Sequence, residues 1–247
     1  MSVHEVRPHH WPDNVQVFYT TREGGHSKDP YRGFNVGLHV GDLEQSVRQN
    51  RAQLLDCLPA GTRIAWLNQV HGTRVVPACD SADVPVSADG SWTGDTKIAC
   101  AVMVADCLPV LLSDRRGSVV AAVHAGWRGL AAGVLESAVA AMKVAPQEVC
   151  AWLGPAIGRD SFEVGPEVSR AFIDNDNRAD SCFRPSDNRP GHYLADLPAL
   201  AEQRLRGLGL IQVQAFEACT VSEPERFFSY RRDGATGRMA CLILRNP

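Results

Sequence analysis

The sequence lacks several short patterns that would assign a protein to a class at once. Its eight cysteines include no C-x-x-C pair, which excludes the usual zinc ribbon and thiol–disulfide redox motifs. Neither G-x-x-x-x-G-K-[S/T] nor G-x-G-x-x-G occurs, so the common nucleotide-binding fingerprints are absent. Candidate functional residues therefore have to be sought among side chains that are far apart in the sequence.

Charge and long apolar runs are also scarce. The formal net charge is −3 over 247 residues, which offers no basic surface for a nucleic acid. No apolar stretch approaches the roughly 20 residues that span a bilayer. The first residues lack the charged-then-apolar pattern of a secretory signal. We therefore expect a cytoplasmic protein that binds neither nucleic acid nor membrane.

No linker, repeat or charge run divides the chain. A hydrophobic content of 45% is ordinary for a globular protein, and the length suffices for a full core. We expect a single domain over residues 1–247. Most of the cysteines lie in apolar, strand-like segments, so we expect them to be small core residues in a reducing compartment.

Hydrophobic patterning predicts both strands and helices. Strands are expected over residues 15–21, 62–70, 149–153, 211–216 and 239–244, and helices over residues 43–58, 166–175 and 196–208. In the first helix the spacing predicts that Val47, Leu54 and Leu55 face inward. The polar segment 77–94 is expected to be a loop. This mixture predicts an α/β protein with mixed sheets.

The central segment 97–142 is the most informative. Two apolar runs, 97–112 and 118–125, flank a polar turn at residues 113–117 and are predicted to be buried strands, and a helical pattern follows. Cys107 and His124 lie toward the far ends of the two runs. Pairing of the two strands would bring a thiol beside an imidazole, the geometry that a metal site or a Cys-His hydrolase requires.

Other candidate residues stand at the ends of predicted strands or in glycine-containing loops. His71 follows a strand, where rigid elements commonly position functional loops. Asp89 precedes a glycine and could act as a base, orient a histidine or simply form a turn. Arg22 lies in a glycine-rich turn and Arg48 on a helix, where solvent exposure is the default.

Six motifs together resemble one known family: TTREGG (20–25), NVGLHVGD (35–42), NQVHG (68–72), ADCLPV (105–110), HAGWRG (124–129) and FSYRRDG (228–234). They resemble the YfiH-like family, also called laccase-domain purine nucleoside phosphorylases and formerly multicopper polyphenol oxidase-like, which includes the bacterial peptidoglycan editing factor. The resemblance covers nearly the whole chain. It implies a single-domain, layered α/β/β/α sandwich and a catalytic zinc held by His71, Cys107 and His124.

A His-Cys-His ligand set leaves one position of a tetrahedral zinc open, as in catalytic sites. The resemblance implies phosphorolysis of adenosine, inosine, guanosine and S-methyl-5′-thioadenosine, and deamination of adenosine. The known base-deaminase signature is absent, so deamination would use a different scaffold. The substrates would be a purine nucleoside and phosphate. As candidate substrate-binding residues we select Arg22, Arg48, Arg128, Asn35 and Tyr230. Asp89 is the candidate for proton transfer.

Two alternatives remain open at this point. Imidazole and thiolate also bind Cu²⁺, so copper could replace zinc. The eight histidines include no His-x-His pair, which argues against a multicopper electron relay. Without a metal, Cys107 and His124 could form a hydrolase or amidase that edits peptidoglycan precursors by removing a wrongly incorporated amino acid such as serine.

Overall fold

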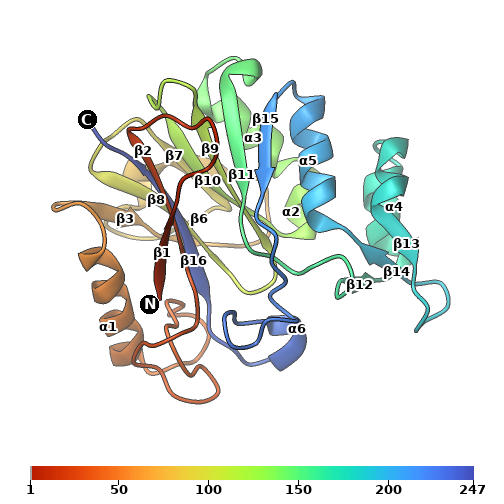
Figure 1. Cartoon of the computed structure of the whole chain (residues 1–247), viewed down its shortest axis with the longest axis horizontal. Helices are drawn as coiled ribbons and strands as arrows, with labels where there is room; N and C mark the ends of the chain where they lie inside the picture. Colours follow the sequence, from red (N-terminus) through yellow and green to blue (C-terminus); the bar gives the residue numbers. More distant parts are fainter. Residues whose placement is uncertain (1) are drawn as a thin grey trace.

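The computed structural model describes residues 2–247 and contains two mixed β-sheets packed face to face (Figure 1). The five-stranded sheet has the order β1 (Val3–Val6), β2 (Val15–Thr20), β16 (Met239–Arg245), β8 (Ile98–Val104), β3 (Arg63–Ala65). The six-stranded sheet has the order β15 (Gln212–Ala215), β11 (Val149–Leu153), β9 (Leu108–Asp114), β10 (Val120–Ala125), β7 (Gly90–Thr93), β5 (Val75–Pro77). Each sheet contains parallel and antiparallel pairs, as predicted.

Helices cover the outer faces of both sheets (Figure 1). The α-helices are α1 (Glu44–Asp56), α2 (Trp127–Ala132), α3 (Val134–Met142), α4 (Pro166–Ile173), α5 (Leu197–Gly207) and α6 (Tyr230–Asp233). Short 3₁₀ turns are η1 (Ala78–Ser81), η2 (Pro146–Glu148) and η3 (Asn177–Cys182). Two small sheets complete the chain: β12 (Glu163–Val164), β14 (Tyr193–Ala195) and β13 (Phe183–Pro185), and β4 (Leu67–Asn68) with β6 (Val86–Ser87).

Three apolar cores separate the layers. Leu111 and Trp152 of the six-stranded sheet pack with Tyr19 of the five-stranded sheet in the core between the sheets. Phe18, next to Tyr19, points to the opposite face and joins the core under α1. Successive strand residues alternate between faces, so a strand covered on both sides must be apolar throughout. The α/β/β/α layering that the resemblance implied is thereby confirmed, whereas the single-domain assignment stays a prediction.

Most predicted elements form within a few residues of the expected bounds, with three exceptions. The apolar run 97–112 is not one strand: it is β8 and β9, which belong to different sheets. The run 62–70 is likewise split into β3 and β4. The expected loop 77–94 contains β7, an internal strand whose short, polar sequence gives no periodic signal but which pairs with β10 and β5. In these cases tertiary pairing outweighs the local pattern.

Two smaller predictions about helices also change. Val47 and Leu54 of α1 are buried as expected, but Leu55 is 41% exposed because it lies one residue, about 100°, around the helix from Leu54. The helical pattern after His124 is interrupted at Gly133, whose φ of 100° separates α2 from α3. Among residues 2–247, no helix is both long and apolar enough to cross a membrane.

Candidate metal centre

Side chains from three separate segments meet at one point. His71 follows β4, Cys107 immediately precedes β9, and His124 lies near the end of β10. Their ligand atoms all lie within 4.8 Å of one another, and Cys107 Sγ is 3.9 Å from His71 Nε2. The β9–β10 pairing sets His124 opposite Pro109, two residues after Cys107. The hairpin thus brings the thiol and the imidazole together, as the sequence predicts.

The Asp89 carboxylate holds both histidines in place by hydrogen bonds to the His124 ring and to the backbone of the His71 loop. Its carboxylate is fully buried and accepts a hydrogen bond from His124 Nδ1 at 2.9 Å. It also accepts the backbone N–H groups of His71 at 2.9 Å and Gly72 at 2.6 Å. A proton held on Nδ1 leaves Nε2 of His124 free to bind a metal. Of the roles considered for Asp89, this geometry favours orientation of a histidine over proton transfer to a substrate.

The loop that carries His71 is pinned from both sides. His71 has a φ of 60°, a conformation that a non-glycine residue adopts only when its surroundings hold it there. Besides the Asp89 contacts, Gln69 Nε2 donates to Met103 O and Gln69 Oε1 accepts from Met103 N–H, both at 2.8 Å. This amide pair attaches the His71 loop to the end of β8.

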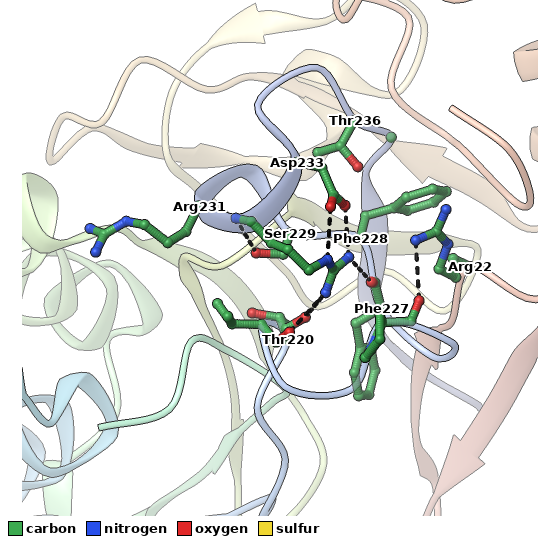
Figure 2. A network of polar contacts seen from close by, with 12 residues as sticks. Arg22, Thr220, Phe227, Phe228, Ser229, Arg231, Asp233 and Thr236 are labelled. Carbon is green, nitrogen blue, oxygen red and sulfur yellow. Dashed lines mark hydrogen bonds and ion pairs between the residues drawn. The ribbon is translucent and has the colours of Figure 1, made fainter. Parts of the chain in front are cut away.

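Asp106 turns the chain between the two sheets, directly before Cys107. Its φ is 95°, and its carboxylate accepts Thr220 Oγ1–H at 2.6 Å and Arg231 N–H at 2.6 Å. The Arg232 guanidinium donates to the carbonyls of Thr220 and Phe227 at 2.7 and 3.0 Å. Figure 2 shows the network of polar contacts around Thr220, Phe227 and Ser229. The position of Cys107 therefore depends on a polar network built by the 220–233 segment.

The glycines of the HAGWRG motif make room for this packing. A Cβ added to Gly126 would lie 2.9 Å from His71 Cδ2 and 3.1 Å from Cys107 Sγ. A Cβ on Gly129 would lie 2.7 Å from the carbonyl oxygen of Gly72. All three distances are shorter than ordinary carbon contacts. Glycine is required at both positions because of close approach rather than backbone conformation.

The electrostatics of the cluster favour an ionised thiol. Burial by itself raises the pKa of Cys107, but His124 and His71 outweigh it and lower that pKa to about 6. Burial lowers the pKa of His124, whereas the Cys107 thiolate and Asp89 raise it to about 9. In contrast, burial without such partners raises the pKa of Cys100 to about 12. Cys107 is thus set apart from a core cysteine by its neighbours.

The donor set fits a metal ion. Ordinary Zn–N and Zn–S bonds in a tetrahedral site place nitrogen and sulfur about 3.6 Å apart. The Cys107 Sγ–His71 Nε2 distance of 3.9 Å is close to that value. Three protein ligands leave a fourth position for water or substrate, as in catalytic rather than structural zinc sites.

The cluster opens into a cavity of about 460 Å³. Its lining combines the three ligands with polar and apolar side chains: His39, Gln69, His71, Met103, Val104, Ala105, Cys107, His124, Tyr230 and Arg238. The volume is in the range of small-molecule sites, and the lining of apolar wall with a few polar groups is typical of them. Tyr230 stands at the rim with 62% of its surface exposed.

The three arginines predicted to bind phosphate do not line this cavity. Arg22 donates to the carbonyl oxygen of Pro224 at 3.1 Å and lies over the Phe228 ring (Figure 2). Arg48 is an exposed ion-pair partner of Glu44 on α1. Arg128 is exposed and covers the Trp127 ring. Sequence proximity to glycine-rich or catalytic motifs does not determine side-chain direction, which explains the difference.

Of the other two predicted substrate-binding residues, Tyr230 lines the cavity and Asn35 does not. Asn35 is fully buried and closes the 35–42 loop through its hydrogen bond to Asp42 at 2.8 Å. Three polar residues of the lining were missed: His39, Gln69 and Arg238. His39 and Gln69 lie inside recognised motifs and could have been selected. Arg238 lies outside them, and no local signal singled it out.

Comparison with known proteins places this geometry in a family. A family model described as multi-copper polyphenol oxidoreductase laccase matches residues 16–246. A purine nucleoside phosphorylase of Pseudomonas aeruginosa is 48% identical over 235 residues, which are 94% of each chain. Purine nucleoside phosphorylase YfiH of Escherichia coli is 45% identical over 232 residues, again 94% of each chain.

Solved structures agree. The crystal structure of a Neisseria meningitidis protein has a TM-score of 0.96 and 47% identity, with 100% of both chains covered. YlmD from Geobacillus stearothermophilus has a TM-score of 0.84 and 30% identity, covering 95% of this chain and 93% of that one. The expected resemblance to YfiH is therefore confirmed, and the chain belongs to the multi-copper polyphenol oxidoreductase laccase family.

Proposed function

We propose that this chain is a metal-dependent purine nucleoside enzyme, which cleaves adenosine, inosine, guanosine and S-methyl-5′-thioadenosine by phosphorolysis and deaminates adenosine. The observation that carries the proposal is the group formed by His71, Cys107 and His124 in the wall of a 460 Å³ cavity. The relatives named purine nucleoside phosphorylase support the substrate class. In phosphorolysis, a phosphate oxygen bonds to C1′ while the bond from C1′ to the base nitrogen breaks, and the base takes up the proton that the phosphate loses. The products are the free base and ribose 1-phosphate, or 5-methylthioribose 1-phosphate from S-methyl-5′-thioadenosine.

Zinc is the metal we propose for the centre. When bound, zinc acts as a Lewis acid and lowers the pKa of a coordinated water to about 7. The chain's own residues prepare the site: Asp89 keeps a proton on His124 Nδ1, so that Nε2 points its lone pair into the cluster. The apolar wall at Met103, Val104 and Ala105, together with the Tyr230 ring, suits a flat purine base.

Cu²⁺ is the alternative occupant, because copper binds imidazole and thiolate strongly. The family is described as multi-copper, but the donors found in this structure are enough for one metal ion only. Within residues 2–247, His71, Cys107 and His124 form the one cluster of three or more His, Cys, Asp or Glu donors. A centre of one metal is supported, and we propose that the protein works in the cytoplasm, where nucleosides and phosphate are available.

Product analysis tests the proposal directly. Zinc-loaded protein is incubated with adenosine, with and without phosphate, and adenine, hypoxanthine and inosine are separated. We expect adenine only in the presence of phosphate and inosine in both conditions. Cys107→Ala should lose both the activity and the metal, while Cys79→Ala, at an exposed cysteine outside the cavity, retains them. Absence of all products from zinc-loaded wild-type protein would refute the proposal.

A second function is favoured by the grouping of the Cys107 thiol with the imidazoles of His71 and His124, whose ligand atoms all lie within 4.8 Å of one another. The two imidazoles also lower the pKa of the thiol to about 6. A thiolate next to an imidazole can attack a carbonyl carbon, as in Cys-His hydrolases. We propose as the alternative an amidase that removes a wrongly incorporated amino acid such as serine from peptidoglycan precursors. Activity that survives chelation but not thiol alkylation supports this alternative, and activity lost on chelation contradicts it.

A further inference from the structure

Besides its apolar wall, the cavity has two basic side chains in its lining. Arg238 and His39 both line it, although they are 199 positions apart in the sequence. Asn35 links them: its Oδ1 accepts the backbone N–H of Arg238 at 2.8 Å, and its Nδ2 donates to Asp42 at 2.8 Å. The 35–42 loop, which carries His39, is thereby fastened to the backbone of Arg238.

Gly37 allows the Arg238 side chain to lie against this loop. A Cβ at position 37 would be 2.9 Å from Arg238 Cγ and 3.2 Å from Arg238 Cβ. The NVGLHVGD motif therefore has a physical role: it positions one histidine and one arginine at the cavity. None of its side chains needs to be a metal ligand for that role.

The Arg238 guanidinium has donors to spare. Nη1 donates to the carbonyl oxygens of Thr236 and Gly237 at 2.9 and 3.0 Å. None of the ion pairs in the part of the chain that the structure describes involves Arg238. Burial lowers the pKa of Arg238, and among the groups that raise it Cys107 comes first and Asp106 second. Asp106 already accepts two hydrogen bonds, from Thr220 and Arg231. An arginine that is partly buried without a carboxylate partner is suited to a bound anion.

A further cation lies behind the pair. Arg51 donates Nε–H to the carbonyl oxygen of Val36 at 2.8 Å and stacks on the Trp66 ring. Burial, Arg238 and Arg51 together lower the pKa of His39, which means that both guanidinium groups act on this ring. Arg51 itself is not part of the cavity lining, so Arg238 is the cation that faces the cavity, and His39, with its lowered pKa, lies beside it as a neutral ring.

We propose that Arg238 and His39 form a phosphate-binding subsite beside the metal centre. The ligand is a tetrahedral oxyanion, either inorganic phosphate or the 5′-phosphate of a nucleotide. Guanidinium N–H groups match the spacing of phosphate oxygens and bind them in pairs, and the His39 ring supplies a further N–H. The assignment rests on the proposed function, since it gives the phosphate of phosphorolysis its place.

The test is the phosphate dependence of adenosine phosphorolysis by zinc-loaded protein. Arg238→Met should raise the KM for phosphate about 10- to 100-fold while the zinc content stays at one per chain. Arg238→Lys keeps the charge but not the paired donors, so its KM for phosphate should lie between those of wild-type protein and Arg238→Met. Arg189→Met, at an exposed arginine outside the cavity, is the matched control. An unchanged phosphate KM in folded Arg238→Met and Arg238→Lys would overturn the subsite.

Direct binding separates this inference from the proposed function. Calorimetry with inorganic phosphate and no nucleoside should show binding to wild-type protein and a 10-fold or greater loss in Arg238→Met. Binding without any turnover would leave the subsite intact and reject the proposed function. Turnover of adenosine whose dependence on phosphate is the same in Arg238→Met and wild type would reject the subsite and leave the proposed function intact.

The source of the oxyanion is distinguished by adenosine 5′-monophosphate. If it competes with phosphate, and the competition weakens in Arg238→Met, the subsite also accepts 5′-phosphates. If it competes only with adenosine, the subsite belongs to inorganic phosphate, whose KM must then still show the Arg238 effect.

Discussion

At the scale of single residues, Asp89 determines how the two histidines face each other. Two carboxylate oxygens accept four donors: His124 Nδ1–H and the backbone N–H groups of Val70, His71 and Gly72. Burial raises the pKa of Asp89, but the hydrogen bonds from His124, Gly72 and His71 outweigh it and hold that pKa below its ordinary value. These contacts support a positioning role for Asp89, and its role in proton transfer stays a prediction.

Asp89→Asn should weaken metal binding. The amide NH₂ would face backbone donors, and the proton on His124 Nδ1 would lose its charged acceptor. We expect about 10- to 100-fold lower zinc affinity, measured by competition with a chromogenic chelator. Asp187→Asn, an exposed carboxylate, is the control. Equal zinc affinity of Asp89→Asn and wild type would show that His124 does not need the hydrogen bond to the Asp89 carboxylate in order to bind the metal.

The thiol of Cys107 provides a pH-dependent readout in metal-free protein. Only the thiolate is alkylated, and a pKa of about 6 means that half of it is present near pH 6. The rate of iodoacetamide labelling at Cys107 should therefore rise between pH 5 and 7 and be level above pH 7. Cys79, whose pKa is raised by partial burial and by Asp80, should label appreciably only at alkaline pH. Mass spectrometry of the labelled peptides measures both, and identical profiles would contradict the account.

At the residue scale, the three candidate metal ligands could be selected from the sequence because each belongs to a motif. His71, Cys107 and His124 stand in three distinctive motifs and meet in space. Which arginines face the cavity was not predictable in the same way, because an arginine is long and its direction depends on neighbours that only the fold supplies. Arg238 is held by contacts with Asn35, which is 203 positions away.

At the scale of elements, the hairpin of β9 and β10 and the start of α2 build the centre. Register sets Ala125 opposite Leu108, so Cys107 and Gly126 come next to one another just beyond the paired residues. Gly126 then ends the strand segment and caps α2. Cys107 and His124 are thus close to each other because of the strand register. The space beside them is free because residue 126 is a glycine and has no side chain.

Gly126→Ala tests this arrangement. The added methyl would lie 2.9 Å from His71 Cδ2 and 3.1 Å from Cys107 Sγ, so one of the two ligands must move. We expect at least 10-fold lower zinc affinity, because ligand geometry has to be held within a fraction of an ångström. Gly207→Ala, where the nearest atom is 3.9 Å away, should leave the zinc affinity unchanged. Native zinc affinity in the Gly126 variant would show that the close approach is not needed.

Element-scale prediction was limited by short polar strands. The long apolar runs gave strands and helices near their observed bounds, since burial on both faces requires apolar residues throughout. β7 is four residues of Gly-Ser-Trp-Thr, and its strand conformation comes from pairing with β10 and β5. The break between β8 and β9 was also hidden, because it depends on one aspartate with a φ of 95° inside an apolar run.

At the scale of the whole molecule, the core between the two sheets holds the metal-binding segments in register. Leu111 lies in β9, four residues after Cys107, and is fully buried in that core. The helices reach the sheets from the outside and do not contribute ligands. Stability of the inter-sheet core and geometry of the centre are therefore linked through β9 and β10.

Leu111→Ala should lower the free energy of unfolding by about 2–5 kcal/mol, because it removes buried methyl groups and leaves a cavity. Val84→Ala, at a residue that is 71% exposed, should change it by no more than about 0.5 kcal/mol. Urea unfolding of wild-type protein and both variants, with and without zinc, measures the change in the free energy of unfolding. A loss below 1 kcal/mol for Leu111→Ala would contradict the packing described for this core.

The layered architecture could be expected from sequence only through the family resemblance. Patterning alone gave an α/β protein with mixed sheets, because periodicity reports which faces are buried and not which strands pair. The order of strands in each sheet depends on contacts such as β16 with β2, which join the two ends of the chain.

The central claim is that two imidazoles and one thiolate bind one metal ion. X-ray absorption at the zinc edge of zinc-loaded protein tests it most directly. We expect one sulfur at about 2.3 Å and two imidazole nitrogens at about 2.0 Å from the zinc, with the sulfur lost in Cys107→Ala. A zinc environment of nitrogen and oxygen alone in wild-type protein would contradict it.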